Sequence, residues 1–273
     1  MSNKVLFQYT LHLSDNALIL GQRNSEWTGH APVLEQDIAI TNIALDFLGQ
    51  ARNFYQYAAL LYNSMNQKEK DAVDNFIPAQ WKSYQRELSE DDLAFLRDDN
   101  QYMNLLLLEL PNGDWGKTIL RQFFFSAFQF FLYQKLIKSK DPQLAAIATK
   151  SLKEVSYHLR WSSEWVIRLG DGTEESNERM KKSVEELWPF TGEMFVPASY
   201  EVQAAKSGFG TDIKKVQEEW SKKVVEICSQ ATLRLPESAW IQTGGKEGKH
   251  TEYLGFILAE MQHLQRAYPN RTW

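Results

Sequence analysis

The chain has 273 residues, 43% of them hydrophobic and 13% aromatic, with a formal net charge of −5 at pH 7. This composition supplies enough apolar surface for one large folded domain and excludes a disordered chain. The acidic balance provides no sequence-wide basic field, which makes nucleic acid a poor candidate partner.

Targeting and redox signals point to a soluble, untargeted chain. The segment from Met1 to Tyr9 has no apolar signal region, and the most apolar stretch, Phe123 to Tyr133, is too short to span a bilayer. Cys228 is the only cysteine, which excludes an intrachain disulfide and any cysteine-based zinc or iron–sulfur site. We expect a cytoplasmic protein without a membrane segment.

Apolar residues recur at helical spacing along the first two thirds of the chain. The pattern predicts a long helix from Pro32 to Tyr62 and a second from about Asp91 to Leu110, which a Pro-Asn-Gly breaker ends. A third spans roughly Lys117 to Ser139. A fourth opens at the Asp141-Pro142 cap and ends at Gly170.

Shorter helical segments follow the four long ones. They are expected near Glu175 to Trp188, Asp212 to Ala231 and Thr251 to Tyr268. No run of alternating strands, internal repeat or linker interrupts the pattern. The sequence therefore predicts an all-α fold with a four-helix bundle core and additional C-terminal helices, formed as a single domain by residues 1–273.

Two residue pairs come close to a metal-binding pattern. A ferritin-like di-iron bundle takes Glu-x-x-His from each of two helices and one Glu from each of the others. Asp98 and Gln101 stand three apart, but an amide is a poor iron ligand; Glu154 and His158 stand four apart, which is the wrong spacing. The third helix, from Trp115 to Lys140, contains no Asp or Glu. We expect no metal site in this chain.

Neutral and charged polar residues share helix faces. Asp46 and Gln50 lie on one face of the first helix, and Gln122 and Gln129 lie on one face of the third. Two interpretations remain open, an ordinary solvated stripe and a polar bundle interior held by hydrogen bonds and ion pairs. The residues that the second interpretation assigns to a buried polar network are Asp46, Glu154, His158 and Arg160.

A glycine-rich loop from Thr243 to Thr251 leads into the last helix and carries Lys246 and Lys249. Glycines and basic residues before a helix can cradle a phosphate through backbone N–H groups. In that interpretation the two lysines contact an anion, such as a coenzyme A phosphate, or an acidic partner surface. The spacing is not that of a P-loop, and a tight turn that caps the helix is the alternative.

Several strings in order connect the chain to a known family. They are Glu26-Trp27-Thr28-Gly29-His30-Ala31-Pro32, Leu48-Gly49-Gln50-Ala51-Arg52-Asn53, Asp141-Pro142-Gln143-Leu144-Ala145-Ala146, Tyr157-His158-Leu159-Arg160, Thr243-Gly244-Gly245-Lys246, His250-Thr251-Glu252 and Ala259-Glu260-Met261-Gln262. From about Tyr9 to Trp273 the chain resembles the structural, ferritin-like C subunit of the multicomponent phenylacetyl-CoA epoxidase. The stretch from Met65 to Ser89 fits less well and resembles an insertion between the first two predicted helices.

The resemblance implies a non-catalytic structural subunit that has lost its metal. Its implied partners are a catalytic di-iron oxygenase subunit that epoxidises phenylacetyl-CoA with O2, a small connecting subunit, and a reductase component that carries FAD and an iron–sulfur centre. The alternatives are a self-sufficient ferritin-like di-metal oxidase and an acyl-CoA binding module. The resemblance also implies that the stretch Gln101, Tyr102, Met103 and Asn104 lies near bound acyl-CoA. The sequence pattern alone indicates ordinary helix residues of mixed polarity at these positions.

Overall fold

The computed structural model describes residues 3–237, 240–269 and 271. Its α-helices are α1 (Asn3–Ser25), α2 (Leu34–Ser64), α3 (Gln67–Asp71), α4 (Glu90–Phe95), α5 (Leu106–Glu109), α6 (Trp115–Leu136), α7 (Pro142–Gly170), α8 (Glu174–Thr191), α9 (Ser199–Ser207), α10 (Ile213–Gln230), α11 (Glu252–Met261) and α12 (His263–Ala267). Short 3₁₀ helices are η1 (Asp74–Phe76), η2 (Trp81–Ser83), η3 (Asp99–Gln101), η4 (Gly192–Phe195) and η5 (Gly245–Glu247).

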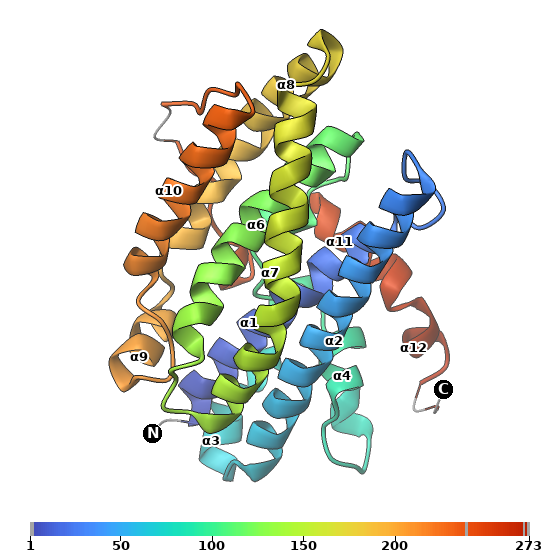
Figure 1. The fold of residues 1–273 in the computed structure, drawn as a ribbon. Helices are drawn as coiled ribbons and strands as arrows, with labels where there is room; N and C mark the ends of the chain where they lie inside the picture. Colours follow the sequence, from blue (N-terminus) through green and yellow to red (C-terminus); the bar gives the residue numbers. More distant parts are fainter. Residues whose placement is uncertain (1–2, 238–239, 270, 272–273) are drawn as a thin grey trace.

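The long helices α1, α2, α6 and α7 form a four-helix bundle (Figure 1). The first two pack along each other, as do α6 and α7, and α2 also contacts α7. On one side α8 and α10 pack against α6 and α7, while α11 lies against α1 and α5. The described residues contain no strand, so the predicted all-α class with a bundle core and added C-terminal helices is confirmed.

The first bundle helix, α1, has no counterpart among the predicted elements. It is buried along most of its length, including polar residues such as His12, Asp15 and Asn16. A helix buried all round shows no apolar stripe, and buried polar residues interrupt what apolar pattern remains. The sequence pattern therefore failed at a helix that is buried on nearly all sides.

The prediction of one continuous helix from Asp91 to Leu110 is wrong. The chain forms α4, the 3₁₀ turn η3, an extended segment and the single turn α5 instead. The Arg97 side chain takes over the carbonyls that a continuous helix would use, since its Nε donates to Leu93 O at 2.6 Å and its Nη1 to Gln101 O at 2.7 Å. Asp98 then opens a new turn, where its backbone N–H donates to Gln101 Oε1 at 2.9 Å.

The cap that the sequence predicts for the fourth long helix is present at the start of α7. Asp141 Oδ1 accepts a hydrogen bond from Leu144 N at 2.8 Å, Pro142 occupies the first turn, and α7 ends at Gly170. At the start of α6, Asp114 Oδ1 accepts from Lys117 N at 2.9 Å. The predicted first and third long helices correspond to α2 and α6.

The stretch from Met65 to Ser89 is an irregular excursion after α2 that contains α3, η1 and η2. Its end returns to α2, because Asn63 Nδ2 donates to Leu88 O at 2.9 Å and Leu88 N donates to Asn63 Oδ1 at 3.1 Å. Among the helices described, none combines the length and apolar character that crossing a membrane requires.

Candidate functional site

Neutral amides join α2, α6 and α7 inside the bundle. Gln50 Nε2 donates to Glu154 Oε2 at 2.9 Å, and Gln50 Oε1 accepts from Gln129 Nε2 at 3.0 Å. Gln129 Nε2 also donates to the Tyr133 hydroxyl at 2.9 Å. Burial raises the pKa of Glu154, while the hydrogen bond from Gln50 opposes this shift. We call Gln50, Gln129, Tyr133 and Glu154 the bundle cluster.

His158 makes a separate contact between α7 and α2. Its ring is fully buried and lies 5.0 Å from the ring of Phe47. Its Nε2 lies 2.9 Å from Asp46 Oδ2, and the Asp46 side chain is 36% exposed. The pair therefore sits where the seam between α2 and α7 reaches the surface.

Arg160 does not belong to either contact. Its side chain is exposed on α7, with the guanidinium 5.8 Å from the Tyr157 ring centroid. Its predicted place in a buried polar network is therefore wrong. The other three predicted residues divide into the pairs Asp46–His158 and Gln50–Glu154 rather than one continuous network.

The side chains in the bundle do not fit a pair of iron ions. Such a centre takes four carboxylates and two imidazoles from the four helices. The bundle cluster offers one carboxylate, on Glu154, and two amides that are engaged with each other. On α1 the single carboxylate, Asp15, is bound by Arg97, and α6 has none. Among the described residues no three His, Cys, Asp or Glu side chains gather as a metal-binding group.

A second buried cluster, which the sequence patterns missed, surrounds Asp15. Its carboxylate forms an ion pair with the Arg97 guanidinium, and both side chains are fully buried. The Tyr55 hydroxyl donates to Asp15 Oδ1 at 2.5 Å, and Met103 N donates to Oδ2 at 2.8 Å. The ring of Tyr102 lies under the guanidinium at 4.1 Å. This cluster fastens the segment after α4 to α1 and α2.

The four residues predicted near acyl-CoA lie in this fastened segment. Gln101 Nε2 donates to the carbonyls of Asn75 and Ile77 at 2.9 and 3.1 Å. The residues after it, Tyr102, Met103 and Asn104, are buried. The Tyr102 hydroxyl donates to Ala94 O at 2.6 Å, and Asn104 Nδ2 donates to Glu109 Oε2 at 2.9 Å. Their contact with acyl-CoA stays a prediction.

The glycine-rich loop cradles a carboxylate of its own chain. Gly244 N and Gly245 N each donate to Glu193 Oε1 at 2.8 Å, and Leu106 N donates to its Oε2 at 2.7 Å. Glu193 is 1% exposed. Burial raises the pKa of Glu193, and the three backbone hydrogen bonds oppose that shift. The predicted N–H cradle therefore exists, but it holds Glu193.

The two lysines of this loop behave differently. Lys246 is buried, and its ammonium lies 2.9 Å from Glu201 Oε2 and donates to the carbonyls of Met194 and Val196. Its predicted contact with an external anion is wrong, because these three acceptors occupy it. Lys249 is exposed on the same loop, so its contact with an anion or partner stays a prediction.

His250 completes the attachment of the C-terminal segment. Its Nδ1 lies 2.8 Å from Glu109 Oε2 and its Nε2 lies 3.0 Å from Tyr102 O. Thr251 N donates to Glu109 Oε1 at 2.6 Å, at the start of α11. Glu193 and Glu109 thus bind the glycine-rich loop and the residues that follow it. Both carboxylates are far from the loop in sequence, and no sequence pattern predicted these contacts.

The chain is 44% identical over 268 residues to the C subunit of the 1,2-phenylacetyl-CoA epoxidase of Escherichia coli (strain K12), and the match covers 98% of this chain and 99% of that protein. The model of the phenylacetic acid catabolic protein family matches residues 1–273. The chain therefore belongs to the phenylacetic acid catabolic protein family.

Proposed function

We propose that this chain is a non-catalytic structural subunit of a 1,2-phenylacetyl-CoA epoxidase complex in phenylacetate catabolism. The nearly end-to-end match to the C subunit from Escherichia coli supports the assignment to such a complex. In it, the chain pairs with and stabilises the catalytic di-iron oxygenase subunit. A small connecting subunit and a reductase with FAD and an iron–sulfur centre complete the assembly, which works in the cytoplasm.

One observation carries the non-catalytic assignment. At the bundle cluster two amides, Gln50 and Gln129, hydrogen-bond to each other, whereas a di-iron protein requires carboxylates in its bundle interior. Glu154 is held by Gln50, and the Asp15 carboxylate is neutralised by Arg97. The interior is thus stabilised by side-chain hydrogen bonds in place of metal–ligand bonds, and the partner must supply the iron.

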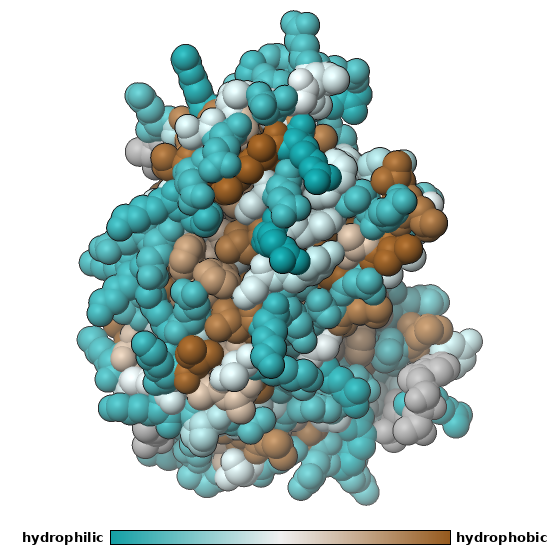
Figure 2. Space-filling model, viewed as in Figure 1, coloured by the Kyte–Doolittle hydropathy of each residue, from teal (hydrophilic) through white to brown (hydrophobic). Residues whose placement is uncertain are grey.

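An exposed apolar row on α2 supports pairing with another chain. Leu34, Ile38 and Leu45 are 71%, 54% and 60% exposed, and their spacing places them on one face of the helix. Figure 2 shows apolar side chains gathered at the end of the molecule where α2 begins. Solvent-exposed apolar rows of this kind are typical of surfaces that another protein covers.

Co-expression with the di-iron subunit of the same complex tests the proposal. We expect the two chains to elute as one species in size-exclusion chromatography, because permanent interfaces bury about 2,000 Å2 or more. The double variant Leu34→Glu/Leu45→Glu places two charges on the apolar row and should weaken the complex. Val225→Glu, at an apolar position on α10 that is 57% exposed, serves as the control.

Chromatography and activity measurements together can contradict the proposal. If the wild-type chains elute separately and the catalytic subunit alone epoxidises phenylacetyl-CoA at the full rate, this chain has no structural role in the reaction. Turnover by this chain without the di-iron subunit would instead identify a self-sufficient oxidase.

A further inference from the structure

Gly49 lies inside the long helix α2, at a position where the fold itself gives no reason for a glycine. The residue is exposed, and among the described residues a Cβ atom placed there would meet nothing within 4 Å beyond its own stretch of helix. Alanine at such a position makes folding about five times more favourable, because glycine loses the most backbone freedom in a helix. Gly49 therefore weakens the isolated chain and leaves a gap in the layer of side chains on α2.

Two different surfaces flank this gap. Leu45 lies one turn before Gly49 and belongs to the exposed apolar row that also contains Leu34 and Ile38. Asp46 lies three residues before Gly49 and points to the other side, where its carboxylate contacts α7. The gap thus lies between an apolar row and the seam that α2 forms with α7.

The seam carries two carboxylates that no cationic side chain neutralises. Asp46 contacts the ring of His158, and Glu154 accepts a hydrogen bond from Gln50. Among the described residues, no lysine or arginine lies within 4.0 Å of either carboxylate. Burial raises the pKa of Glu154, and the charge of Asp46 raises it further, while Gln50 and His158 act in the opposite direction. A cation from outside the chain would relieve the repulsion between the two carboxylates.

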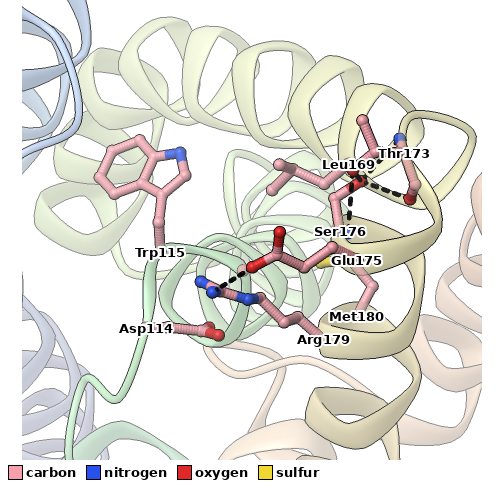
Figure 3. A pocket seen from close by; sticks show the side chains of 9 residues that line it. Asp114, Trp115, Leu169, Thr173, Glu175, Ser176, Arg179 and Met180 are labelled. Carbon is pink, nitrogen blue, oxygen red and sulfur yellow. Dashed lines mark hydrogen bonds and ion pairs between the residues drawn. The ribbon is translucent and has the colours of Figure 1, made fainter.

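Other surface carboxylates have a cationic partner within the chain. In the half-open pocket at the start of α6, Glu175 pairs with Arg179 at 2.5 Å (Figure 3). Glu186 pairs with Lys117 at 2.6 Å in the same way. The seam therefore differs from these sites, and its negative charge is complementary to a basic group on a partner.

We propose that a helix of the catalytic di-iron subunit crosses α2 at Gly49 and places a lysine or arginine side chain against Asp46 and Glu154. The side chains at a helix contact set the distance between the two axes, so the gap at Gly49 allows a close approach. The row that contains Leu45 then packs against apolar residues of the crossing helix. This inference rests on the proposed pairing of the two subunits and adds the contact point and the charge that the partner supplies.

Gly49→Ala tests the close approach through two measurements of opposite sign. The isolated chain should unfold at a higher urea concentration than the wild type, because alanine favours the helix and meets no clash. Its affinity for the di-iron subunit should fall at least about 5-fold, because the added methyl group enters a packed contact. Gly49→Leu should weaken binding further.

Gly255→Ala is the matched control for Gly49→Ala. Gly255 is also an exposed helix glycine whose Cβ position is open, but it lies on α11, outside the surface that α2 and α7 form. This substitution should stabilise the isolated chain and leave its affinity for the di-iron subunit unchanged.

Glu154→Gln tests the charge of the crossing helix. The new side chain keeps an oxygen that accepts the hydrogen bond from Gln50 but removes the negative charge. Association with the di-iron subunit should become slower and less dependent on salt. Glu175→Gln is the control, because Glu175 is paired with Arg179, and it should leave both quantities unchanged.

The proposal is overturned if the wild-type chains form a complex that Gly49→Ala and Gly49→Leu form equally tightly, or if Glu154→Gln associates as the wild type does. It is also overturned if the isolated chain is a dimer that Gly49→Leu dissociates, since the crossing helix would then come from a second copy. Separate elution of the wild-type chains contradicts the proposed function as well, so the two failures are distinguishable.

Discussion

Lys246 Nζ lies 2.9 Å from Glu201 Oε2, and the side chains are only 4% and 5% exposed. This ion pair joins the glycine-rich loop to α9 across the interior of the protein. Because both charges are removed from water, each depends on the other for compensation. The loop that resembles an anion site in sequence is therefore a structural attachment point.

Replacement of Lys246 should destabilise the protein strongly. Lys246→Met leaves the Glu201 carboxylate buried without its counter-charge, which costs about 3–5 kcal/mol in comparable cases. Lys249→Met, three residues away and exposed, should change the free energy of unfolding by less than about 0.5 kcal/mol. Urea unfolding of both variants measures the difference. Equal effects of the two substitutions would contradict a buried ion pair at Lys246.

His250 should make stability depend on pH. Burial lowers the pKa of His250, but the hydrogen bond and charge of Glu109 outweigh burial and leave the pKa above its usual value. Both ring nitrogens face acceptors, Glu109 Oε2 and Tyr102 O, which only the protonated ring satisfies together.

The sign follows from the raised pKa. The stabilisation is fully present below the unfolded pKa of about 6.5 and is lost as the pH rises through the higher folded pKa. His250→Gln should therefore cost more stability in mildly acidic than in alkaline buffer. His263→Gln, at an exposed position on α12, is the control and should show no such trend. A cost that grows with rising pH would contradict the assignment.

His158 should contribute to stability and not to turnover. His158→Ala removes a fully buried ring and its hydrogen bond to Asp46, so we expect a loss of about 1–3 kcal/mol. Arg160→Ala, exposed on the same helix, should be close to neutral. Thermal unfolding gives the first comparison, and epoxidase activity of the reconstituted complex gives the second. An unchanged melting temperature with lost turnover would instead make His158 catalytic.

Elements with local signals were predictable from the sequence. The cap at Asp141 and the apolar stripe of α2 each depend on residues a few positions apart. The failures share a cause, which is long-range bonding by side chains. Asp15 and Arg97 are 82 residues apart, yet their ion pair explains both a polar residue inside α1 and the interruption of the expected second helix.

The candidate site likewise has features that the sequence predicts and features that only the folded structure shows. The lack of acidic residues on α6 is a property of the sequence, and the expectation of an incomplete set of iron ligands follows from it directly. The partners of the glycine-rich loop were not predictable, because Glu193 lies about fifty residues before Gly244 and Gly245, and Glu109 lies 141 residues before His250. Lys246 is buried and has a structural role, whereas Arg160 is exposed. The sequence did not predict this difference, because it depends on how the helices pack.

Iron content tests the central claim most directly. The isolated chain is loaded anaerobically with Fe(II), freed of excess metal and analysed for iron, alongside its complex with the catalytic subunit. With Gln50 and Gln129 in the bundle cluster and no carboxylate on α6, we expect no stoichiometric iron in the isolated chain and about two irons per heterodimer. About two irons bound to the isolated chain, with an oxo-bridged absorption band, would contradict the assignment of this protein as a non-catalytic subunit.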